Sequence, residues 1–211
     1  MKKNCVVRRV LVLGCLLMVW GCGNTQPTHF YLLRAMDPPL SRASVEAIDS
    51  GLSLGLGPIS LAKYLDRPQI VTRASPHEIH LAEFHKWASP LKGHVSQILE
   101  ENLSQLLATE GIVSYPWKRS NLPNFQLSLD IIQFDGIQSE EAVLKVRWML
   151  AKDAGKTVLH NKTSEFSEIV QGPAYEDLAK AMSRMLASLS REIADAINVR
   201  STLAITDSKP K

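Results

Sequence analysis

The stretch 125-FQLSLDIIQFDGIQSEEAVLKVRWML-150 contains two segments in which apolar and polar residues alternate. Successive side chains of a β-strand point to opposite faces of the sheet, so each segment has one apolar face and one polar face. The apolar faces consist of Phe125, Leu127, Leu129 and Ile131, and of Leu144, Val146, Trp148 and Leu150. A KDAG turn at 152–155 leads into a third segment, 156–170. This order predicts an antiparallel meander with one face in water.

Two amphipathic helices are expected around this meander. The first has Ser89 as its N-cap, Pro90 in the first helical position and Gly111 as its C-cap. Its apolar face recurs at helical spacing and consists of Leu91, Val95, Ile98, Leu99, Asn102, Leu103 and Leu106. The second begins near Pro173 and runs to about Val199. Its apolar stripe consists of Leu178, Ala181, Met182, Met185, Leu189, Ile193 and Ile197.

Upstream of the first helix, four shorter segments have strand patterns, at 29–35, 52–60, 68–74 and 78–84. Pro68 predicts that the third of them is an edge strand, since proline cannot donate to a sheet ladder. Together the elements predict an α+β fold. We expect a single domain in which a largely antiparallel sheet carries two amphipathic helices packed on one face.

The first 21 residues are typical of a secretory leader. A basic start is followed by a short apolar run from Val10 to Trp20, which is too short to span a bilayer. The residues Val19-Trp20-Gly21 before Cys22 resemble the lipobox of bacterial lipoproteins, which implies cleavage and acylation at Cys22. An ordinary signal peptide is the alternative, and Cys15 is a weaker candidate for the lipidated residue because little apolar sequence precedes it.

These features divide the chain into four parts. We expect a lipoprotein leader at 1–21, a lipidated tether at 22–28, the folded domain at 29–201 and a polar tail at 202–211. Cys5 and Cys15 would leave with the leader, so Cys22 has no partner for an internal disulfide. Gly23, in place of aspartate, resembles the sorting pattern of Gram-negative lipoproteins and favours the periplasmic face of the outer membrane.

The charge of the expected mature chain argues against nucleic acid as a partner. The leader holds four of the 24 basic residues and none of the 21 acidic ones, so 20 basic residues face 21 acidic ones after cleavage. A chain with this near balance lacks the excess of cations that binds a phosphate backbone.

The motifs that could carry chemistry are weak. Ser53 lies in a G-x-S-x-G match at 51–55, but a nucleophile elbow needs a strand-to-helix turn, and here a leucine-rich strand pattern and Pro58 follow. His77 and His80 point to opposite faces of a strand, so they do not form a metal site together. No P-loop is present either. We therefore expect no catalytic residue, no metal and no cofactor.

Several motifs resemble those of the ABC-type transport auxiliary lipoproteins, the PqiC/YmbA-like family. The matching stretches are FYLL at 30–33, GPISLAKYLDRPQIVTR at 57–73, WASPL at 87–91, ILEENLSQLL at 98–107 and YPW at 115–117. The chain departs from the family at Ala62, where a proline is usual.

The resemblance implies a non-enzymatic role in intermembrane lipid transport. It implies as partners an MCE-domain protein, which forms a periplasmic conduit, and its ABC-linked permease. The lipoprotein would dock the conduit at the outer membrane, as a ring of copies around its end. We expect the contact surface to include Tyr64, Arg67, Arg73 and Trp87. Core packing for Tyr64 and Trp87, and a solvated face for the arginines, are the alternative interpretations.

Two other functional classes compete with a docking role. In one, the domain is a lipid-binding module that carries an apolar ligand between its sheet and helices, which requires a cavity of several hundred Å³. In the other, the protein is a hydrolase that uses Ser53 or a histidine.

Overall fold

The computed structural model describes residues 26–38, 52–118 and 122–207, so the expected leader and Cys22 lie outside the described residues. The chain forms eight strands and two helices in these ranges. They are β1 (His29–Tyr31), β2 (Leu54–Leu61), β3 (Gln69–Ser75), β4 (Glu78–Trp87), α2 (Leu91–Leu106), β5 (Ile112–Ser114), β6 (Phe125–Gly136), β7 (Glu141–Lys152), β8 (Thr157–Ile169) and α3 (Tyr175–Asp207). The predicted single-domain α+β fold is confirmed.

The larger sheet has five strands in the order β5-β2-β6-β7-β8. Strands β6, β7 and β8 form the predicted antiparallel meander, with Leu129 opposite Trp148 and Lys145 opposite Glu165. Strand β2 runs parallel to both β5 and β6, because α2 lies on the path from β2 to β5 and returns the chain in the same direction. The parallel pairings were not foreseen.

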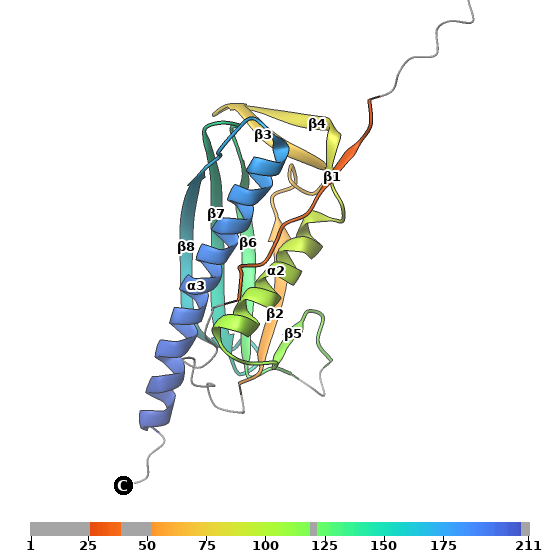
Figure 1. The fold of residues 1–211 in the computed structure, drawn as a ribbon. Coiled ribbons are helices and arrows are strands. Elements are labelled where there is room, and N and C mark those ends of the chain that lie inside the picture. The colour runs from red at the N-terminus through yellow and green to blue at the C-terminus, as the bar shows by residue number, and fades with distance from the viewer. Residues whose placement is uncertain (1–25, 39–51, 119–121, 208–211) are drawn as a thin grey trace, which may run out of the picture.

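The remaining strands form a second sheet of three strands, in the order β1-β4-β3. Strand β3 lies at an edge of this sheet, as Pro68 predicts. The apolar residues Ile79 and Leu81 of β4 are 39% and 38% exposed, whereas Ala82 of the same strand is buried. The small sheet sits at one end of the molecule, beyond the ends of β6 and β7 (Figure 1).

Both helices cover the same face of the five-stranded sheet, as predicted (Figure 1). The apolar sides of β6 and β7 and the apolar stripe of α3 are buried against one another. The stripe residues expected from the sequence are all at most 1% exposed: Leu178, Ala181, Met182, Met185, Leu189, Ile193 and Ile197. Helix α3 continues to Asp207, beyond the expected end near Val199 and into the segment expected to be a polar tail.

The predicted caps of α2 are wrong. Pro90 occupies the N-cap position and no side chain caps the helix, so Ser89 lies outside it. At the other end Leu107 is the C-cap, and Ala108 adopts a left-handed conformation with φ of 47°. Thr109 N–H then donates to the Ser104 carbonyl oxygen, which closes a Schellman turn without glycine.

Residues 32–38, which we call the strap, run from β1 along the two helices (Figure 1). Met36 N–H donates to Asn102 Oδ1 of α2 at 2.8 Å, and Arg34 N–H donates to Ser183 Oγ of α3 at 3.1 Å. Asn102 is fully buried and also donates to Ser190 Oγ of α3 at 3.1 Å. One amide therefore links the strap to both helices. In the described part of the chain, no helix has the length and apolarity needed to cross a bilayer.

Candidate functional site

Polar side chains from three parts of the chain converge on Asp135, near the end of β6. Tyr64 Oη donates to one carboxylate oxygen at 2.7 Å, while Arg73 Nε and Gln133 Nε2 donate to the other at 2.7 and 2.9 Å. We call these four residues the Tyr64 cluster. The Asp135 side chain is fully buried, whereas that of Arg73 is 23% exposed. The cluster thus joins a buried anion to a cation that reaches the surface.

The Tyr64 phenol is held in its neutral form. Burial first, and then the hydrogen bond to Asp135 and the charge of that carboxylate, raise the pKa of Tyr64 to about 12, while Arg73 opposes the change. The pKa of Arg73 is also raised, chiefly by its hydrogen bond to Asp135. At physiological pH the tyrosine is therefore a hydrogen-bond donor rather than a nucleophile.

The other two residues expected at the contact surface lie close by. The backbone N–H of Trp87 donates to the Pro68 carbonyl oxygen at 2.7 Å. This bond ties the end of β4 to the loop that contains Tyr64 and Arg67. The Trp87 side chain is 4% exposed and packs edge-on against His94. The Nε atom of Arg67 is buried and has no hydrogen-bond partner among the described residues. The expected contact residues therefore surround one loop, with Trp87 beneath it.

The sequence patterns did not identify Asp135 and Gln133 as site residues. The ladder between β6 and β7 shifts register between Ile131 and Gln133, so one residue of β6 is unpaired. This bulge reverses the alternation, which turns Phe134 into the core and Asp135 to the other face of the sheet. The doubled isoleucine at 131–132 is the only sequence signal at this point, and it does not specify a bulge.

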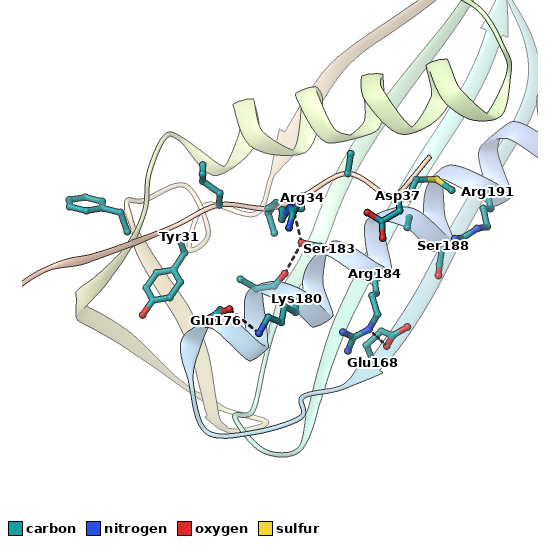
Figure 2. A pocket seen from close by; sticks show the side chains of 17 residues that line it. Tyr31, Arg34, Asp37, Glu168, Glu176, Lys180, Ser183, Arg184, Ser188 and Arg191 are labelled. Atoms are coloured by element: carbon teal, nitrogen blue, oxygen red, sulfur yellow. Dashed lines mark hydrogen bonds and ion pairs between the residues drawn. The ribbon is translucent and has the colours of Figure 1, made fainter. Parts of the chain in front are cut away.

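A groove of about 870 Å³ lies between α3 and the N-terminal segment that includes the strap (Figure 2). The chain's N-terminal side contributes mainly apolar residues, among them Phe30, Leu32 and Leu33. Helix α3 contributes charged and small residues, among them Lys180, Ser183 and Ser188. The groove is therefore apolar along one wall and polar along the other.

Ion pairs occupy part of the charged wall. Figure 2 shows Arg184 beside Glu168 and Lys180 beside Glu176, at 2.8 and 2.9 Å. Within the described ranges, neither Arg34 nor Arg191 has an ion-pair partner. Both of these arginines line the groove and are exposed, so they are its free cations.

Histidines that are distant in sequence come together at the start of α3. His85 stacks on Tyr175 and on His29, with ring centroids 4.0 and 5.3 Å apart. Tyr31 Oη lies 2.7 Å from His85 Nδ1. Burial, and then the charge of His29, lower the pKa of His85. The stack anchors β1 to α3 and to β4, a contact that spacing along the sequence does not reveal.

Ser53 does not stand on a nucleophile elbow. It directly precedes β2, and its carbonyl oxygen accepts a hydrogen bond of 3.0 Å from Phe125 N–H. The strand leads through a turn into β3 rather than into a helix. The strand-to-helix elbow that would lift a serine nucleophile is therefore not formed around Ser53.

The described residues form an α+β domain with a polar cluster and a groove, and comparison with known proteins gives the class. Residues 31–194 match the ABC-type transport auxiliary lipoprotein component family. The chain belongs to this family, which confirms the resemblance seen in its motifs. Among curated proteins no sequence match was found.

Two solved structures share the fold over most of the chain. Protein XCC0632 from Xanthomonas campestris superposes with a TM-score of 0.69 at 14% identity, covering 86% of this chain and 100% of that one. The crystal structure of an uncharacterized protein superposes with a TM-score of 0.66 at 21% identity, covering 82% of this chain and 99% of the other. At these identities the likeness shows the fold alone.

Proposed function

We propose that this protein is an outer-membrane lipoprotein, acylated at Cys22, that acts as an auxiliary component of an MCE-type, ABC-linked lipid-transport system. It docks the periplasmic conduit of an MCE-domain protein at the outer membrane, as a ring of copies around the conduit's end. The observation that carries the proposal is the family match over residues 31–194. That match begins beyond the segment in which the leader and anchor are expected.

The contact surface in this proposal is the loop at 62–68 together with the Tyr64 cluster. Arg67 and Arg73 are the charged residues that a partner meets, because both are partly exposed. Tyr64 and Asp135 hold Arg73 in place, and Trp87 supports the loop from the core. Rigid polar side chains over a packed base suit recognition, since little conformational freedom is lost on binding.

The proposed role is non-enzymatic. Two observations support it: the Tyr64 phenol stays protonated, and Ser53 precedes a strand rather than standing on an elbow. Ser53→Ala should therefore leave the envelope phenotype of the wild type unchanged. Loss of function in this variant, with normal protein level, would favour a hydrolase instead.

The first experiment is a pull-down of the tagged, full-length protein from membranes in mild detergent, with co-purifying proteins identified. We expect an MCE-domain protein among them. Arg67→Glu should reduce its recovery, because the substitution reverses a charge on the loop without removing a residue of the Tyr64 cluster. Arg191→Glu on α3 is the matched control and should retain the partner. Sedimentation of the purified complex would test the ring.

Three results would each count against one part of the proposal. Absence of any MCE-domain protein would remove the partner from the proposal. Equal recovery with Arg67→Glu and Arg191→Glu would place the contact elsewhere. Loss of the protein from the membrane fraction in the wild type would remove the anchor.

The groove supports a second candidate, a domain that itself holds a lipid. Its volume of about 870 Å³ is in the range of pockets for drug-sized ligands, and its wall includes the free cations Arg34 and Arg191. Phospholipid should then co-purify with the protein. Ser188→Trp, which fills the groove, should remove it, whereas Ser96→Trp on α2 should not. Protein without bound lipid after gentle extraction would exclude this candidate.

A further inference from the structure

The segment around β1 and the strap exposes alternate residues in a regular row. Phe30 and Leu32 are 66% and 60% exposed, and Arg34 is exposed as well. Between them, Leu33 is 4% exposed and Tyr31 is partly buried. In an extended chain, residues two apart point the same way, so Phe30, Leu32 and Arg34 form one outward row. We call these three residues the outward row.

The direction of the outward row is fixed by the fold. The Arg34 and Met36 amides donate to side chains of α3 and α2, and Leu33, next to Arg34, is buried. At the other end, the His29–His85 and Tyr31–His85 contacts hold β1 to β4. Two neighbouring large apolar side chains are therefore held in water, as is common where a surface meets a partner or a membrane.

The expected anchor places a bilayer within reach of this row. Phe30 follows Cys22 by eight residues. A chain of that length spans at most about 29 Å when extended, and its typical end-to-end distance as a flexible coil is about 16 Å. Such a tether keeps the row at a high effective concentration next to the membrane surface.

We propose that the outward row is a second contact with the bilayer that carries the anchor. Phe30 and Leu32 enter the interfacial region, and Arg34 lies at the level of the lipid phosphates, since arginine buries its stem in apolar surroundings and keeps its charge in the polar zone. The inference rests on the acylation of Cys22 that belongs to the proposed function. A bilayer is preferred over a protein partner because the tether holds the row beside the membrane in every molecule.

This contact gives the lipoprotein an orientation. The helix layer and strap face the membrane, while the opposite face of the five-stranded sheet faces the periplasm. The Tyr64 cluster lies on that opposite face of β6, since Asp135 alternates with the core residue Phe134. The loop proposed to meet the conduit lies at the same end of the molecule as the outward row, since Lys86 of β4 pairs with both Phe30 and Gln69.

The test uses the full-length, acylated protein in vesicles of phosphatidylethanolamine and phosphatidylglycerol whose acyl chains carry bromine, which quenches nearby tryptophan. One variant is Phe30→Trp, and the matched control is Val158→Trp, at a residue 53% exposed near the start of β8. Both variants retain the native tryptophans, so their difference reports on the added indole. Flotation with the vesicles is measured first.

We expect a blue-shifted emission and loss of most of the added fluorescence in Phe30→Trp, with neither change in Val158→Trp. Equal quenching of the two variants would overturn the proposal, as would a blue shift without quenching, which would indicate cover by a second copy. Failure of the protein to float would remove the anchor and with it this inference. The pull-down of the MCE-domain protein tests the docking role separately.

Discussion

Tyr64 and Asp135, 71 residues apart, are joined by a hydrogen bond of 2.7 Å from the phenol to a carboxylate that is completely buried. The same carboxylate accepts from Arg73 of β3, so the loop after β2 and the small sheet are both tied to β6. The cluster therefore fixes how the two sheets meet, and with it the shape of the proposed contact surface.

Arg73→Leu should lower the free energy of unfolding by about 3 kcal/mol, because it leaves the Asp135 carboxylate buried without its cation. Arg147→Leu breaks an exposed ion pair with Asp130 and should cost about 0.5 kcal/mol or less. Urea unfolding of both variants measures the difference. Equal losses would show that the Asp135 site is not energetically distinct from a surface pair.

The pKa of Tyr64 predicts a loss of stability in alkali. The phenol has a pKa of about 12 in the folded protein, against 10.0 for an unperturbed tyrosine. Its contribution is therefore complete below pH 10 and is lost as the pH rises toward 12. The wild type should lose more stability than Tyr64→Phe across this interval. Parallel pH profiles for the two proteins would contradict the assignment.

Asn102→Leu should release the strap from the helices. The variant removes the acceptor of the Met36 amide and the donor to Ser190, so exchange of the Met36 amide hydrogen should become about tenfold faster. Hydrogen exchange read by NMR measures this directly. Gln97→Leu, at an exposed site on the same helix, is the control and should leave the rate as in the wild type.

Substitution by alanine should change the stability of the protein in opposite directions at Gly93, in α2, and at Gly111, just before β5. Gly93 lies in α2 and a Cβ there would meet no atom within 4 Å, so Gly93→Ala should stabilise by about 0.5–1 kcal/mol. At Gly111 a Cβ would collide with the Leu52 carbonyl oxygen, and Gly111→Ala should destabilise by about 1–3 kcal/mol. Thermal unfolding tests both. Unchanged or increased stability of Gly111→Ala would contradict the collision expected with the Leu52 carbonyl oxygen.

The sequence also predicted that this protein is a lipoprotein, and the match of residues 31–194 to a lipoprotein family supports that prediction. The motifs that carried the resemblance include YLDRPQIV, whose first residue is Tyr64 of the cluster. The proposed contact at this loop therefore rests on the sequence resemblance. Its counterpart Asp135 was not predicted, because nothing in the neighbourhood of residue 135 along the chain points to Tyr64.

Local sequence determined several elements of this protein. The meander of β6, β7 and β8 and the buried stripe of α3 follow from which side chains avoid water, and the edge position of β3 follows from Pro68, which cannot donate to a ladder. Only the tertiary structure decided the parallel pairing of β2, the separation into two sheets, the bulge that turns Asp135 toward Arg73 and the path of the strap between the helices. Those features depend on contacts between residues far apart in the chain. Side-chain alternation specifies the faces of a strand but not its neighbours, and neighbours are chosen by the packing of the whole core.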